Sequence, residues 1–138
     1  MYKWVNNYIG IPFLSGGRDC NGVDCYGLVR LVMKEQYSYD LPVFIGTYTN
    51  ALNLQQTKNL FIEQVPVLTG ENLEKPQEGA ICLIKHRGLL SHVGIYAGDN
   101  YIIHSRDNVG VILEKIGSPN LRGAISGWYK INEGYRIS

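Results

Sequence analysis

Two cysteines and two histidines are the side chains of this sequence best suited to covalent chemistry. Cys20 and Cys25 flank the segment NGVD, and His92 and His104 follow much later in the chain. A nucleophile, a base and a group that orients the base are the minimum for acyl transfer by a thiol. For the two cysteines the alternatives are a disulfide, a metal site, inert core thiols, or catalysis.

Cys25 stands where a loop is predicted to become a helix. From Cys25 to about Tyr37 apolar residues recur with a helical period, and Asp24 is a good N-cap. The unpaired N–H groups of a helix start favour a thiolate, so this position is expected to lower a thiol pKa. Gly22 and Gly27 are expected to leave room for a substrate backbone. The alternative is that Cys25 is a small buried hydrophobe, the common fate of a free cysteine.

The two histidines fall on neighbouring predicted strands. Residues 92–97 alternate with the period of two that is typical of a strand. The Gly-Asp-Asn turn at 98–100 leads into a second strand at 101–104, so the two are expected to pair as a hairpin. Singly, His92 or His104 could be a structural histidine. Two imidazoles around one hairpin, together with a cysteine at a helix start, indicate catalysis instead.

The remaining cysteines and His86 are interpreted without a chemical role. Cys82 lies in an apolar segment and is predicted to be in the core, whereas His86 lies in a charged turn and is predicted to be solvated. A zinc site with Cys20 and Cys25 lacks a second ligand pair of similar spacing. A disulfide between them is geometrically possible, but a cytoplasmic product argues against it. Cys20 is therefore interpreted as incidental or as a packing residue.

Composition indicates one α+β domain. The 138 residues contain no internal repeat and no linker-like tract, so we predict a single domain over residues 1–138. Thirteen Lys+Arg against twelve Asp+Glu give no bulk charge for nucleic acid or anionic membranes. The chain has no apolar run of about 18 residues and no signal-peptide pattern. We therefore expect synthesis in the cytoplasm without a signal peptide.

The predicted elements place helices before strands. A short helix is expected over 1–8, a loop over 11–24, and helices over 25–37 and 50–64. The predicted strands are 80–84, 92–97, 101–104, 109–116 and 124–131. This order predicts an α+β domain with an antiparallel sheet.

Several motifs in order resemble one known family. They are IGIPF at 9–13, the glycine pair at 16–17, DCYGLV at 24–29, HVGIY at 92–96 and IIHS at 102–105. Together they are similar to the NlpC/P60 papain-like cysteine peptidases, whose usual motifs are Asp-Cys-Ser-Gly-Leu/Phe-Val and His-Val-Gly-Ile-Tyr. The resemblance covers nearly the whole chain. The order Cys, His, His is that of the ordinary branch of the family and not of its circularly permuted branch.

The resemblance implies a role for each matching residue. Cys25 would be the nucleophile, His92 the general base, and His104 the residue that orients His92. Phe13, Asp24 and Tyr26 would lie near the substrate or the oxyanion. Phe13 stands where many members carry a tyrosine whose hydroxyl supports the oxyanion, and one such donor is worth roughly 2.7–4 kcal/mol. The resemblance implies neither a metal nor a cofactor.

The resemblance also implies a fold, a substrate and a setting. The fold would be papain-like, with N-terminal helices packed on an antiparallel sheet of about five to six strands. The substrate would be peptidoglycan stem peptide, cut between D-γ-glutamyl and a diamino acid. The segments 17–19 and 128–129, with Tyr26, look most like phage and prophage tail-tip members. A virion-associated enzyme acting at the cell wall, with tail proteins as partners, is then expected. The alternatives are a structural tail component, or an amidase, deamidase or acyl transferase acting on another substrate.

Overall fold

The computed structural model of the chain describes residues 1–43, 68–86 and 88–138. The predicted helix at 50–64 and the side chain of His86 lie outside these described residues. None of the helices in the described residues is long and apolar enough to cross a membrane.

The N-terminal part of the chain supplies two of the described helices and a small hairpin, and a short 3₁₀-helix, η3 (Glu133–Tyr135), lies near the C-terminus. The predicted short helix is a 3₁₀-helix, η1 (Lys3–Asn7), and the predicted main helix is α1 (Cys25–Tyr37). The prediction that residues 11–24 are all loop is wrong, because they contain the antiparallel pair β1 (Arg18–Asp19) and β2 (Gly22–Val23). Two-residue strands are too short to leave an alternating pattern in the sequence.

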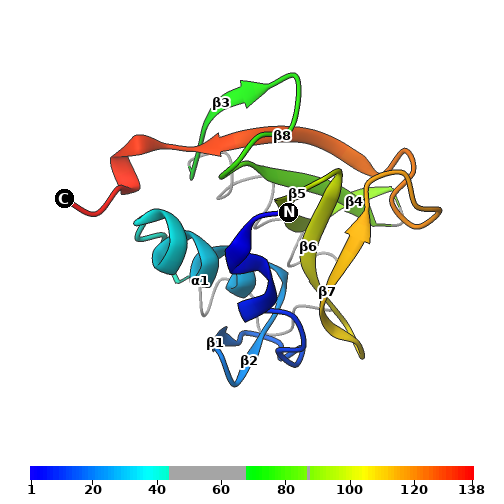
Figure 1. Cartoon of the computed structure of the whole chain (residues 1–138), viewed down its shortest axis with the longest axis horizontal. Helices are drawn as coiled ribbons and strands as arrows, with labels where there is room; N and C mark the ends of the chain where they lie inside the picture. Colours follow the sequence, from blue (N-terminus) through cyan, green and yellow to red (C-terminus); the bar gives the residue numbers. More distant parts are fainter. Residues whose placement is uncertain (44–67, 87) are drawn as a thin grey trace.

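The strands between residues 69 and 131 form a six-stranded antiparallel sheet (Figure 1). Its spatial order is β3-β8-β4-β5-β6-β7. The strands are β3 (Thr69–Leu73), β4 (Ile81–His86), β5 (Leu89–Gly98), β6 (Tyr101–Arg106), β7 (Gly110–Lys115) and β8 (Ile125–Ile131). Every strand except β3 is predicted by the sequence, with shifted ends. β3 escapes prediction because TGENL is largely polar, as suits the exposed edge of a sheet.

The tight turn between β5 and β6 keeps the two histidine-bearing strands adjacent. Asp99 and Asn100 both have positive φ, 53° and 69°, as a two-residue type I′ hairpin turn requires. β5 and β6 pair antiparallel on either side of this turn. His92 and His104 therefore lie on neighbouring strands, as the sequence predicts.

The main core lies between α1 and one face of the sheet. Leu28 and Val32 of α1 are fully buried there, and full burial of such a side chain stabilises the fold by about 1.5–3 kcal/mol. The predicted alternation in β5 is confirmed by the strand residues of this core, Val93, Ile95 and Ala97. The other face of the sheet carries a smaller cluster of Cys82, Ile84, Ile102 and Leu121. The core thus holds the start of α1 against β5.

Candidate active site

Cys25 is the first residue of α1 and is buried at the helix start. As predicted, Asp24 is the N-cap, and its Oδ1 accepts a hydrogen bond from the Gly27 N–H at 2.8 Å. Burial raises the pKa of the Cys25 thiol to about 12, and the negative charge of Asp24 acts in the same direction. The backbone N–H groups of Val93 and Tyr26 favour the thiolate and lower that pKa, but by less. The expectation that the helix start lowers the thiol pKa is therefore wrong in net direction, because desolvation outweighs it.

The two imidazoles contact each other directly. Nε2 of His92 lies 2.8 Å from Nδ1 of His104, with the ring planes at 68°. The N–H of Val93, the residue after His92, faces the Cys25 thiol, so this part of β5 lies against the start of α1. The structure thus places the backbone of the His92 strand beside the thiol, and the two imidazoles beside each other. Their roles as nucleophile, base and orienting group stay predictions.

A carboxylate behind His104 belongs to the same cluster, and the sequence analysis does not single it out. Nε2 of His104 lies 2.9 Å from Oε1 of Glu114, and the Ser118 hydroxyl donates to Oε2 at 3.0 Å. Burial alone would raise the pKa of Glu114, but the hydrogen bonds from Ser118 and His104 hold it below its usual value. One signal could have revealed this residue. An acidic side chain stands in the interior of the predicted strand 109–116, next to the strand that carries His104.

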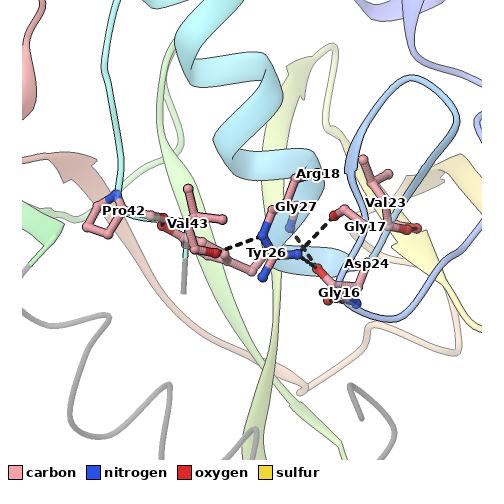
Figure 2. A network of polar contacts seen from close by, with 10 residues as sticks. Gly16, Gly17, Arg18, Val23, Asp24, Tyr26, Gly27, Pro42 and Val43 are labelled. Carbon is pink, nitrogen blue, oxygen red and sulfur yellow. Dashed lines mark hydrogen bonds and ion pairs between the residues drawn. The ribbon is translucent and has the colours of Figure 1, made fainter. Parts of the chain in front are cut away.

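Figure 2 shows the polar network that fixes the start of α1. The Asp24 carboxylate is fully buried; its Oδ2 accepts from the Gly16 N–H at 2.9 Å and its Oδ1 from Nη1 of Arg18 at 2.9 Å. Arg18 also donates to the carbonyl oxygens of Gly17 and Val43. Arg18 therefore links Asp24, the residue that precedes Cys25, to the chain that follows α1.

Tyr26 and Phe13 are the other residues expected near the substrate. Tyr26 is 2% exposed, and its hydroxyl donates to the Pro42 carbonyl oxygen at 2.6 Å, with the Arg18 guanidinium 5.3 Å from its ring centre. Phe13 is half-buried and its backbone bridges to Val23. Tyr26 thus forms part of the support of the helix start. The nearness of Phe13, Asp24 and Tyr26 to a substrate stays a prediction.

Glycine is needed at positions 22 and 27 for a different reason from the one expected. A Cβ at Gly27 would lie 2.0 Å from the Gly17 carbonyl oxygen, and one at Gly22 would lie 2.6 Å from Cβ of Leu14. Atoms of the protein fill the space beside both glycines. The expectation that these glycines leave room for a substrate backbone is therefore wrong, since they allow the segment 14–17 to pack against α1 and β2.

Replacing Gly27 with alanine is expected to lower the free energy of unfolding by about 3 kcal/mol, because the new methyl group overlaps backbone. The thermal midpoint should fall by roughly 10 °C. The matched control is Gly117→Ala, where a Cβ meets nothing within 4 Å, and its effect should stay within about 0.5 kcal/mol. Equal thermal midpoints for the two variants would show that the segment 14–17 does not constrain the start of α1.

All three cysteines are free thiols. Cys20 is exposed at the turn between β1 and β2, and Cys25 and Cys82 are buried. The alternative of a disulfide between Cys20 and Cys25 is therefore not the state that the structure shows. The prediction that Cys82 belongs to the core is confirmed, and burial raises its thiol pKa to about 12.

Comparison with known proteins links the chain to one family. The model of the NlpC/P60 family matches residues 10–125. Murein DD-endopeptidase MepS/Murein LD-carboxypeptidase of Escherichia coli K12 is 28% identical over 110 residues, which are 80% of this chain and 50% of that protein. Probable endopeptidase NlpC of the same organism is 28% identical over 112 residues, 78% of this chain and 61% of that protein. The chain therefore spans between one half and two thirds of the length of these curated relatives.

Solved structures share the fold. NlpC1 from Trichomonas vaginalis superposes with a TM-score of 0.66 at 19% identity, covering 99% of this chain and 43% of that one. The NlpC/p60 domain of the peptidoglycan hydrolase SagA superposes with a TM-score of 0.62 at 21% identity, covering 91% of this chain and 92% of that one. These likenesses confirm the expected papain-like α+β fold.

Proposed function

The chain belongs to the NlpC/P60 family, whose model matches residues 10–125, and we propose that it is a cysteine endopeptidase that hydrolyses the stem peptides of peptidoglycan. One observation carries this proposal. A cysteine at a capped helix start lies beside the strand of His92, whose imidazole is hydrogen-bonded to His104 at 2.8 Å. Nucleophile, base and orienting group are the parts that acyl transfer by a thiol needs.

The proposed reaction begins from a neutral thiol, because burial holds the Cys25 pKa high. As Sγ attacks the scissile carbonyl carbon, Nδ1 of His92 takes the thiol proton, and the carbonyl electrons move onto the oxygen. The C–N bond then breaks, and His92 gives the proton to the leaving amine. A water deprotonated by His92 attacks the thioester, and Cys25 leaves and recovers its proton. The Cys25 backbone N–H would be one oxyanion donor.

A finer proposal concerns the bond and the biological setting. We propose cleavage between D-γ-glutamyl and the diamino acid, by a protein of a phage or prophage tail tip that thins the wall during entry. The support is the resemblance of segments 17–19 and 128–129, and of Tyr26, to tail-associated members. Peptidoglycan peptide and tail proteins would then be the partners, and the virion the location.

The alternative is a structural tail component with little peptidase activity. Two observations favour it: Phe13 offers no hydroxyl to an oxyanion, and burial raises the Cys25 pKa. Labelling with iodoacetamide near neutral pH separates the two readings. Since a buried neutral thiol reacts slowly in either case, the deciding comparison is with His92→Gln: slower Cys25 alkylation in that variant supports the enzyme, and an unchanged rate supports the structural component.

Digestion of purified muropeptides by the wild type and by Cys25→Ala, with the products identified by mass spectrometry, tests the proposed function. Endopeptidase action gives two shorter products whose summed mass exceeds that of the substrate by one water, and the identity of each product locates the bond. Loss of ammonia without chain cleavage would identify an amidase or deamidase instead. No product from any muropeptide, with intact protein, would refute wall hydrolysis.

A further inference from the structure

We propose that Glu114 is a positioning residue that sets the tautomers of both histidines, so that Nδ1 of His92 can accept the Cys25 proton. This proposal rests on the proposed function, since it takes His92 as the base for Cys25. It extends the site by one residue, from β5 and β6 to β7. The order of groups is then Cys25, His92, His104 and Glu114, each on a different element of the fold.

The protonation state of Glu114 fixes the position of the proton on His104. The hydrogen bonds from Ser118 and His104 outweigh burial and keep the pKa of Glu114 below its usual value, so the group is ionised at neutral pH. An ionised carboxylate only accepts hydrogen bonds. The 2.9 Å contact between Oε1 of Glu114 and Nε2 of His104 therefore requires the His104 proton to be on Nε2.

The tautomer of His104 in turn fixes the tautomer of His92. His104 is 2% exposed, and burial lowers its pKa more than Glu114 raises it, so its imidazole is neutral and carries one proton. With that proton on Nε2, Nδ1 of His104 is an acceptor. Nε2 of His92, 2.8 Å away, must then be the donor. A neutral His92 with its proton on Nε2 has its lone pair on Nδ1, as a general base for a thiol needs.

The negative charge of Glu114 also acts on His92 during the reaction. When His92 becomes an imidazolium, it donates to His104, which in turn donates to the negative Glu114. Among the described residues, the other charged or polar groups that contact Glu114 are Arg106 of β6, whose Nη1 is 4.0 Å from Oε1, and Ser118 and Asn120 beyond β7. Arg106 weakens the field of the carboxylate without replacing it, because its side chain is 42% exposed. The carboxylate therefore stabilises the charged state of His92 through His104.

Glu114→Gln tests both parts of this proposal. If the new amide turns its oxygen to His104, the His104 tautomer is kept and only the negative charge is lost. If it turns its nitrogen to His104, the tautomer is reversed. Either orientation should lower kcat by about 10- to 100-fold, the size typical of groups that orient a reacting ligand. KM should change little, and the acid limb of the pH–rate profile should move to lower pH, because an imidazolium at His92 loses the carboxylate behind it. The matched control is Glu71→Gln, which changes an exposed carboxylate of β3 near Lys130. It should alter neither kcat nor the pH–rate profile.

Two measurements do not depend on muropeptides. ¹⁵N-histidine NMR of the wild type should show the Nε2–H tautomer for both His92 and His104, with single His→Gln variants assigning the three histidines of the chain. In a Cys20→Ser background, Glu114→Gln should also slow the alkylation of Cys25 by iodoacetamide. An Nδ1–H tautomer for His104 in the wild type would overturn the proposal, as would unchanged alkylation and pH profile in a folded Glu114→Gln variant. If the tautomers and the alkylation agree but no muropeptide is cut, the proposed substrate fails and the role of Glu114 stands.

Discussion

Replacing Cys25 with alanine is expected to lower muropeptide cleavage by at least about 10⁴-fold, because removal of a nucleophile leaves only binding and oxyanion contacts. The change deletes one sulfur atom from a site that is 8% exposed. A cavity of that size costs on the order of 1 kcal/mol of unfolding free energy, so the protein should stay folded. Muropeptide turnover and circular dichroism on the same sample check both statements.

The other two cysteines are the matched controls. Cys82→Ala removes a sulfur that is fully buried and lies on the face of the sheet away from α1, within the smaller cluster. It should lose similar stability and keep its activity. Cys20→Ala removes an exposed thiol and should change neither. Full cleavage by Cys25→Ala, or an equal loss of activity in Cys82→Ala, would remove Cys25 from the role of nucleophile.

Three residues of the candidate site could be predicted because their signals are local. Cys25 follows a capping residue at the start of a periodic segment, and His92 and His104 flank a recognisable hairpin turn. Glu114 could not be found in the same way, because its contact with His104 depends on the pairing of β6 with β7. Register depends on the hydrophobic patterns of both strands and on the turn that joins them, so the sequence of either strand alone does not fix it.

For the fold, too, elements with a local sequence signal are predicted and the others are not. Strands with an alternating or apolar pattern are predicted, whereas the two-residue pair β1–β2 and the polar edge strand β3 are not. The pKa of Cys25 is the clearest case. The helix start suggests a lowered value from local sequence, but the packing of α1 against β5 desolvates the thiol and reverses the direction. Desolvation is a property of the assembled core, so no motif reports it.

Asp24 illustrates how a motif residue can serve the site without activating it. Its charge raises the Cys25 pKa, which is the wrong direction for an activating group. Its contacts are instead structural, since it caps α1 at Gly27 and binds Arg18 and the Gly16 N–H. We therefore expect Asp24 to hold Cys25 in place while making its thiolate less stable. Stability and thiol reactivity should then respond in opposite directions when the charge is removed.

Asp24→Ala is accordingly expected to lower the free energy of unfolding by about 3–5 kcal/mol, because it breaks a buried ion pair and a helix cap together. Asp24→Asn keeps an oxygen for the Gly27 N–H and should cost less. The double variant Asp24→Asn/Arg18→Met should recover part of that loss, since no buried charge remains beside the amide. Urea unfolding of the wild type, Asp24→Asn, Arg18→Met and the double variant gives the coupling energy. In folded Asp24→Asn, Cys25 alkylation near neutral pH should be faster than in the wild type. Slower alkylation with unchanged stability would mean that the carboxylate activates the thiol, contrary to a structural role.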